Sequence, residues 1–191
     1  MKPFSKIKPK LVDEFSSKNH KRIKYSNDFM KVIEYEDWSL IEQKDAVFCI
    51  PYLIEKNQFI IRKEYIPTFK YRDGNEYHLA LVGGGIEEEE SPETALLREL
   101  QEEAGLVLSD TYKINFEPSF FFNKGQVNKV YFSIMNLTSR DYDEIPIRGD
   151  GSKTESLSST IGVDLKYLNN LIPSDIITDW GLMKFRSYLN I

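Results

Sequence analysis

The stretch from Gly84 to Leu106 constrains this chain more than any other. It contains a glycine turn, an acidic loop and a helix whose second half carries Arg98, Glu99, Glu102 and Glu103. Glu99 and Glu103 are four residues apart and Glu102 is three residues from Glu99, so the three side chains converge on one edge of the helix. Clustered carboxylate oxygens are the ligands that Mg²⁺ and Mn²⁺ prefer. The segment therefore predicts a site for a divalent cation.

The same segment also indicates phosphate chemistry. Magnesium usually keeps several waters and binds through a few carboxylates together with the phosphates of a substrate. The turn Gly83–Gly85 lets the backbone come close to a metal or a phosphate, and Arg98 can hold a carboxylate in a bidentate pair. The alternative is a solvated acidic face, which is the usual role of a charge run.

Charge is distributed unevenly along the 191 residues. The net charge of −5 is moderate and argues against general affinity for nucleic acid. Residues 1–24 hold eight Lys/Arg and two carboxylates, a net charge of +6, which leaves −11 for the remainder. This basic arm is either a phosphate-binding segment or a solvated tail.

Cysteine usage and hydropathy limit the compartment. Cys49 is the only cysteine, so no disulfide forms within the chain, and a reducing compartment is expected. No apolar stretch reaches the roughly 20 residues that a membrane span needs, and the first residues lack the apolar segment of a signal peptide. We therefore expect a cytoplasmic protein with no membrane partner.

Hydrophobic patterning predicts a mixed fold. An apolar stripe and the Ser91-Pro92 start indicate a helix that ends at Gly105. Charged, glycine-bearing stretches predict loops at 70–76 and 139–154. Alternating or apolar runs predict strands, and two further helices follow them: strands 28–38, 46–54, 59–65, 77–82, 113–122, 129–137 and 155–163, then helices 164–172 and 174–188. This order suits an α+β fold, or an α/β/α sandwich around a central mixed sheet.

The spacing of the acidic segment resembles the signature of the Nudix hydrolase family at every fixed position. It runs Gly84, five residues, Glu90, seven residues, Arg98-Glu99-Leu100, one residue, Glu102-Glu103, one residue, Gly105-Leu106. The resemblance implies the Nudix fold, an α/β/α sandwich, over residues 41–191. Residues 1–40 are then a basic arm and leading strand, at the interface of an expected homodimer.

The same resemblance implies Mg²⁺-dependent (or Mn²⁺-dependent) hydrolysis of a nucleoside diphosphate joined to another group. Metals neutralise the phosphate and polarise the attacking water in such enzymes. Carried over residue by residue, the metal ligands are the Gly83 carbonyl and the side chains of Glu99, Glu102 and Glu103. Arg98 orients a carboxylate, and Arg98 and Glu99 both belong to the catalytic set.

Within the family the chain is most similar to ADP-ribose pyrophosphatases. In these proteins a glutamate in the loop before the last strand often acts as base, which implies Glu155, with Asp150 and Glu144 as alternatives. Two positions depart from the subfamily, which usually has arginine at Tyr65 and glutamate at Ala80.

The expected substrate is ADP-ribose or a nucleotide sugar, and its expected contacts are Arg62, Tyr65 and Trp38. The alternatives are a dinucleotide polyphosphate, NADH, a nucleoside triphosphate, or a nucleotide-binding module without catalysis.

Overall fold

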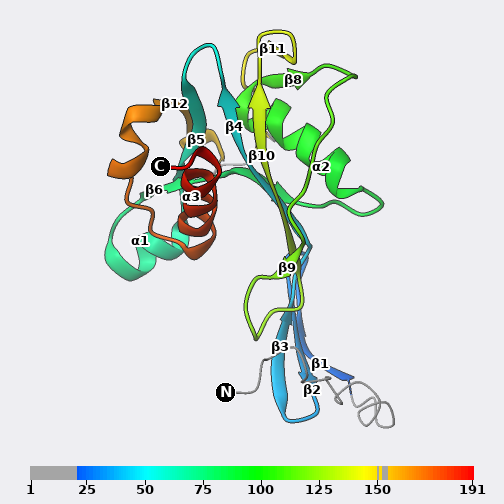
Figure 1. Cartoon of the computed structure of the whole chain (residues 1–191). Helices are drawn as coiled ribbons and strands as arrows, with labels where there is room; N and C mark the ends of the chain where they lie inside the picture. The colour runs from blue at the N-terminus through cyan, green and yellow to red at the C-terminus, as the bar shows by residue number, and fades with distance from the viewer. Residues whose placement is uncertain (1–20, 150, 152–154) are drawn as a thin grey trace, which may run out of the picture. The chain divides into compact units, whose positions relative to one another are not determined.

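The structure, a computed structural model, describes residues 21–149, 151 and 155–191, with Glu155 described by its backbone alone. Most of the predicted basic arm, residues 1–20, and the alternative base Asp150 lie outside this description. The chain divides into two compact units (Figure 1). One unit comprises the residues up to Gln43 together with Phe121–Asn128, and the other comprises Lys44–Phe120 and Lys129–Ile191.

The first unit contains an antiparallel sheet of three consecutive strands: β1 (Lys21–Ser26), β2 (Lys31–Tyr35) and β3 (Trp38–Glu42). The expected single strand over 28–38 is wrong, because the chain reverses between Tyr35 and Trp38, which face each other in the ladder. Glu36 adopts a φ of 52° at this turn, in the left-handed region that a tight reversal requires.

The second unit is built on a mixed sheet that has seven strands among the described residues. The order β12-β5-β4-β10-β9 forms its spine, β6 pairs with β5, and β7 pairs with β4. β4 and β10 are parallel, whereas the pairs β4–β5, β5–β12, β5–β6 and β4–β7 are antiparallel. The strands are β4 (Ala46–Leu53), β5 (Gln58–Tyr65), β6 (Tyr77–Ala80), β7 (Val82–Gly85), β9 (Phe120–Phe121), β10 (Lys129–Leu137) and β12 (Ser159–Asp164).

Strand β4 lies inside the sheet although it contains Pro51. On its antiparallel side, residues 46–49 pair with β7 and residues 52–53 pair with β5. Pro51 falls in the gap between these two ladders, where its missing N–H leaves no antiparallel partner unpaired. The proline therefore marks the point at which β4 changes its neighbour.

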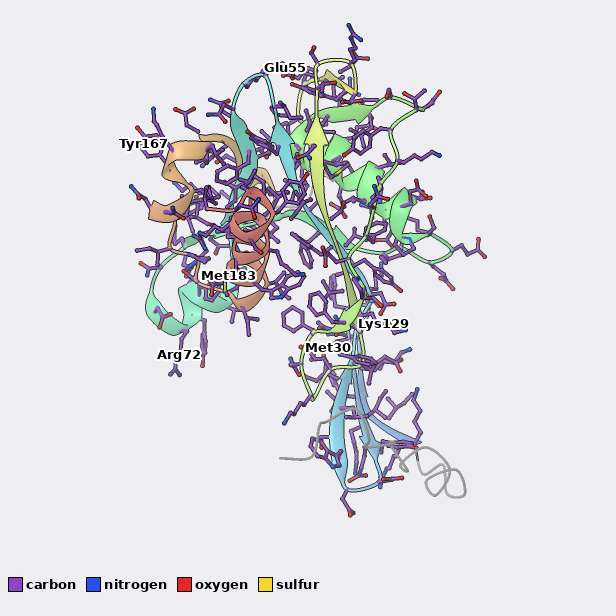
Figure 2. The ribbon with its side chains drawn as sticks, viewed as in Figure 1. Met30, Glu55, Arg72, Lys129, Tyr167 and Met183 are labelled. Atoms are coloured by element: carbon purple, nitrogen blue, oxygen red, sulfur yellow. The ribbon has the colours of Figure 1, made fainter. Side chains whose placement is uncertain are left out.

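Helices cover both faces of this sheet (Figure 1). On one face, α2 (Pro92–Glu99) and the π-helical turn η2 (Leu100–Ala104) pack on β4, with Ala95, Leu96 and Leu100 fully buried. On the other face, α3 (Ile176–Leu189) and the 3₁₀ turn η4 (Leu165–Asn170) form a second apolar cluster. The outward sides of these elements carry exposed side chains such as Tyr167 and Met183 (Figure 2). The three layers confirm the predicted α/β/α sandwich.

Several local expectations are wrong for reasons that the structure makes plain. The expected loop 70–76 overlaps helix α1 (Pro67–Asp73), which starts on a proline and ends at Gly74 with a φ of 76°. The expected strand 113–122 is reduced to β9. The remaining elements are β8 (Leu106–Leu108), β11 (Tyr142–Glu144) and the 3₁₀ turn η3 (Glu155–Leu157). β11 lies inside the expected loop 139–154 and pairs with β8.

Candidate active site

The glycine strand β7 lies directly against the acidic helix. A Cβ added at Gly84 would lie 2.9 Å from Cδ of Glu99 and still closer to its Oε1. A Cβ at Gly83, whose φ is +145°, would lie 2.8 Å from the Cα of Phe48 on the paired strand. The two missing side chains therefore let β7 come close to β4 at Gly83 and to the Glu99 carboxylate at Gly84.

The helix begins and ends as its residues dictate. The Ser91 hydroxyl accepts a hydrogen bond from the Thr94 N–H at 3.1 Å, and Pro92 occupies the first turn. After Glu99 the helix widens into η2, and it ends at Gly105 with a φ of 64°. A π-helical turn changes the angular spacing of the side chains that follow it, so the directions of Glu102 and Glu103 could not be taken from ideal helix geometry.

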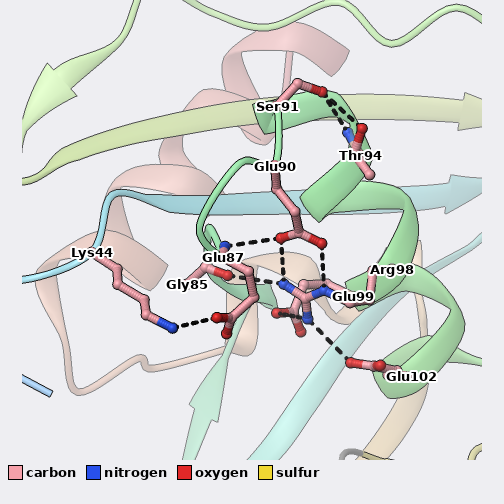
Figure 3. A network of polar contacts seen from close by, with 9 residues as sticks. All are labelled: Lys44, Gly85, Glu87, Glu90, Ser91, Thr94, Arg98, Glu99 and Glu102. Atoms are coloured by element: carbon pink, nitrogen blue, oxygen red, sulfur yellow. Dashed lines mark hydrogen bonds and ion pairs between the residues drawn. The ribbon is translucent and has the colours of Figure 1, made fainter. Parts of the chain in front are cut away.

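Arg98 joins the acidic loop to the helix (Figure 3). Its Nε and Nη2 donate to the two carboxylate oxygens of Glu90 at 3.0 and 3.1 Å, a bidentate pair. Nη1 donates to Glu99 at 2.7 Å and to Glu102 at 3.2 Å, and Nη2 also reaches the Gly85 carbonyl at 2.9 Å. One guanidinium thus fixes three of the signature carboxylates.

The pKa values of Glu99 and Glu90 shift in opposite directions, because only Glu99 is buried. Burial raises the pKa of Glu99, and the ion pair with Arg98 opposes this rise without cancelling it. The hydrogen bonds from Arg98 and from the Glu87 N–H lower the pKa of Glu90. An additional positive charge beside Glu99 would therefore favour its ionised form.

Glu103 has different partners from the carboxylates that Arg98 holds. One of its oxygens accepts a hydrogen bond from the Gly83 N–H at 2.9 Å. The other forms an ion pair with Arg62 of β5, and the two side chains are only 10% and 5% exposed. Arg62 faces Ala80 across the β5–β6 ladder. The predicted substrate contact Arg62 is thus a buried partner of a predicted metal ligand.

The cluster suits a hard divalent cation in donor type and in charge. It contains five carboxylates and three cationic groups: Glu87, Glu90, Glu99, Glu102 and Glu103 with Lys44, Arg62 and Arg98. When all are ionised the cluster keeps two negative charges, which one divalent ion balances. Across the described ranges, no three His, Cys, Asp or Glu side chains are arranged as a ready metal-binding group, because the glutamates are turned toward Arg98 and Arg62. The oxygen donors fit Mg²⁺ or Mn²⁺ once these carboxylates turn away from the arginines.

A pocket of about 400 Å³ opens beside the end of the helix. Its lining contains the predicted ligands Glu102 and Glu103, and it also contains Arg148, which is not among the residues predicted from the sequence. The other lining residues are Arg62, Ile147, Gly149, Gly151, Ser156, Ser158, Ser159 and Thr160. The hydroxyl-rich run 156–160, close after an arginine, is the sequence signal that could have indicated this wall.

Comparisons with known proteins identify the family. A family model described as the NUDIX domain matches residues 43–158, which is more than half of the chain. The chain belongs to the NUDIX family. With the family's signature intact, it is a NUDIX pyrophosphohydrolase.

One similar solved structure is described as the crystal structure of an ADP compounds hydrolase. It matches with a TM-score of 0.65 and 18% identity, over 89% of this chain and 91% of the other, and at this identity the likeness supports the fold. A comparison with curated proteins found no match. Among the helices of the described residues, none combines the length and apolar character that a membrane span requires.

The remaining predicted NUDIX site residues are spread around this centre. Glu155 begins η3 and directly precedes Ser156 of the pocket wall, whereas Glu144 forms an ion pair with Lys56 at β11. The ring of Tyr65 packs edge-on against Tyr77, with centroids 6.1 Å apart, and does not line the pocket. Trp38 belongs to the first unit and is 58% exposed.

Proposed function

We propose that this protein hydrolyses the diphosphate linkage of a nucleoside diphosphate derivative, with ADP-ribose or a nucleotide sugar as first choice. The observation that carries the proposal is the pocket that Glu102, Glu103 and Arg148 line together. Such a site offers carboxylates for a cation and a guanidinium for a phosphate within one cavity. The printed description of the similar solved structure, an ADP compounds hydrolase, supports placing adenosine diphosphate compounds first in the assay.

The signature residues take the roles that their positions allow. The side chains of Glu99, Glu102 and Glu103 and the carbonyl of Gly83 would hold Mg²⁺ or Mn²⁺, which neutralises phosphate charge and makes bound water more acidic. Arg98 keeps Glu99 and Glu102 oriented through its Nη1.

Glu155 acts as the base in this proposal. It accepts a proton from water as the water oxygen bonds to phosphorus and the bridging P–O bond breaks, and the leaving phosphate keeps the electron pair. Its place beside the pocket wall supports this role, since the next residue, Ser156, lines the pocket.

A hydrolysis screen with product identification by mass tests the function. Purified full-length protein with Mg²⁺ or Mn²⁺ is incubated with ADP-ribose, nucleotide sugars, NADH, dinucleotide polyphosphates and nucleoside triphosphates. We expect ADP-ribose to give AMP and ribose 5-phosphate. If ADP-ribose and the nucleotide sugars stay intact while a dinucleotide or a triphosphate is cleaved, the substrate class changes to that alternative. If every compound stays intact, the hydrolase proposal fails.

The predictions for the rest of the chain stand as part of this proposal. Arg62, which lines the pocket, is the predicted substrate contact that this site supports, and the contacts expected for Tyr65 and Trp38 stay predictions. The protein is proposed to be cytoplasmic and homodimeric, with residues 1–40 at the interface. The exposed Ile23, Tyr25 and Trp38 of the first unit support burial of that region in an interface. Light scattering on the full chain tests the dimer, and a monomer at micromolar concentration would contradict it.

A further inference from the structure

Arg148 is held beside the signature helix by its own backbone neighbours. The Gly149 N–H donates to the Glu102 carbonyl at 3.2 Å, and the Ile145 N–H donates to the Gly105 carbonyl at 2.8 Å. A Cβ at Gly105 would collide with the Ile145 carbonyl, so the glycine permits this close approach. Residues 145–149 are thus fixed to the end of the helix that carries the glutamates.

The charge of Arg148 is not matched within the described part of the pocket. The other lining cation, Arg62, pairs with Glu103, and Glu102 receives a hydrogen bond from Arg98. Among the described residues Arg148 makes no ion pair, and it is exposed at the pocket wall. A guanidinium in this position matches the geometry of a phosphate, to which it can donate two parallel hydrogen bonds.

The rest of the wall is suited to a sugar. Its described lining contains hydroxyl groups and glycine backbone, one aliphatic side chain and no aromatic ring. The hydroxyls of Ser158 and Thr160 are already bonded to the Tyr65 N–H and to the Glu103 carbonyl, which fixes the strand β12 side of the wall. Nucleobases are usually held by stacking on aromatic rings, which the described lining lacks, whereas hydroxyls and backbone groups suit the hydroxyls of a sugar.

We propose that this pocket binds the sugar-phosphate half of the substrate and that Arg148 binds the phosphate of that half. The inference rests on the proposed function and makes it more specific. The volume of this pocket, about 400 Å³, is at the small end of the roughly 300–1,000 Å³ range of ligand pockets. It therefore favours a diphosphate linked to a sugar over a dinucleotide, whose second base would have to occupy the same wall.

Product binding tests this assignment without requiring turnover. Ribose 5-phosphate and AMP are titrated separately into full-length protein with Mg²⁺, by calorimetry, for the wild type and for Arg148→Gln. We expect the dissociation constant of ribose 5-phosphate to rise about tenfold or more in the variant, the scale of one lost charged hydrogen-bond pair. The constant for AMP should change by less than about twofold, since AMP is the other half.

Arg140→Gln is the matched control, because Arg140 is an exposed arginine of the same region that does not line the pocket. It should leave both constants unchanged, and Arg148→Lys should restore part of the affinity because it keeps the charge and loses the fork. Equal weakening of both ligands, or no change in either, would overturn the inference.

The two proposals fail separately. An inert hydrolysis panel contradicts the enzyme proposal, whatever the binding data show. Turnover of ADP-ribose with Arg148→Gln kinetics identical to wild type, in both KM and kcat, contradicts only the role of Arg148. If the role is correct, KM for ADP-ribose rises about tenfold while kcat changes by less than about threefold, since Arg148 is assigned to binding.

Discussion

Replacing Gly84 by alanine tests the contact between the glycine strand and the signature helix. The Gly84 backbone does not adopt the left-handed conformation, so alanine introduces no backbone strain there. Its Cβ would nevertheless lie 2.9 Å from Cδ of Glu99 and nearer still to Oε1, which is closer than real Cβ contacts. Because this oxygen accepts the 2.7 Å hydrogen bond from Arg98, the carboxylate must leave that position.

The expected loss of stability in Gly84→Ala follows from the hydrogen bond between Arg98 and Glu99. A hydrogen bond to a charged group contributes about 1.5–3 kcal/mol. A glycine-to-alanine change also stabilises by about 0.4–1 kcal/mol through the unfolded chain, which partly hides the loss. Gly85→Ala carries the same effect on the unfolded chain and so corrects for it. The Cβ of an alanine at this position would meet only the Lys44 side chain, at 3.6 Å, an ordinary contact. We therefore expect Gly84→Ala to be about 1.5–3 kcal/mol less stable than Gly85→Ala.

Urea unfolding of the two variants measures this difference, and initial hydrolysis rates across a Mg²⁺ titration measure its functional counterpart. With Glu99 displaced, Gly84→Ala should need at least about tenfold more Mg²⁺ for its half-maximal rate. A loss of metal affinity of about this size is typical when a residue that positions a metal ligand is changed. Gly85→Ala should behave as wild type. If the free energies of unfolding of the two variants differ by less than about 0.5 kcal/mol and their Mg²⁺ dependence is the same, the close contact with Gly84 does not position Glu99.

Three further predictions concern single glutamates, two in the site and one on β5. Glu103→Gln should lower Mg²⁺-dependent kcat by about 10² or more, and the loss of its buried ion pair should lower the free energy of unfolding by about 3–5 kcal/mol; unchanged turnover at saturating Mg²⁺ would contradict the ligand assignment. Glu155→Gln should lower kcat about 10²-fold with little effect on KM, and a rate within about threefold of wild type would move the base to Glu144 or Asp150. Burial raises the pKa of Glu64, so the folded state holds its proton more tightly and stability falls as pH rises from about 4.3 through the raised value. Glu64→Gln should therefore raise Tm at about pH 8, have no effect near pH 4, and flatten the pH dependence, as thermal unfolding will show.

Local chemistry made much of the fold predictable. The strand over 129–137 and the hairpin strand over 59–65 have the expected positions because apolar runs with turn residues at their ends leave few alternatives. The helix start at Ser91-Pro92 and its end at Gly105 also match the prediction.

Errors arose where long-range pairing overrides local preference. The segment 113–122 has a strand-like composition, yet only Phe120–Phe121 are in a strand. The reverse happened at 142–144, a charged stretch that becomes a strand because it pairs with Leu106–Leu108. Helix α1 was missed because its short, exposed sequence lacks an apolar stripe.

The sequence by itself determined the chemistry of this protein, because the signature lies within one short segment whose spacing can be counted. It identified Glu99, Glu102 and Glu103 as a carboxylate group on one helix. Only the tertiary structure decided that Glu103 pairs with Arg62 of β5 and that Arg148 lines the same pocket, since both arginines lie far from the signature in the sequence. Burial, close approach and pocket walls are made by segments far apart in the chain, so they are properties of the folded molecule.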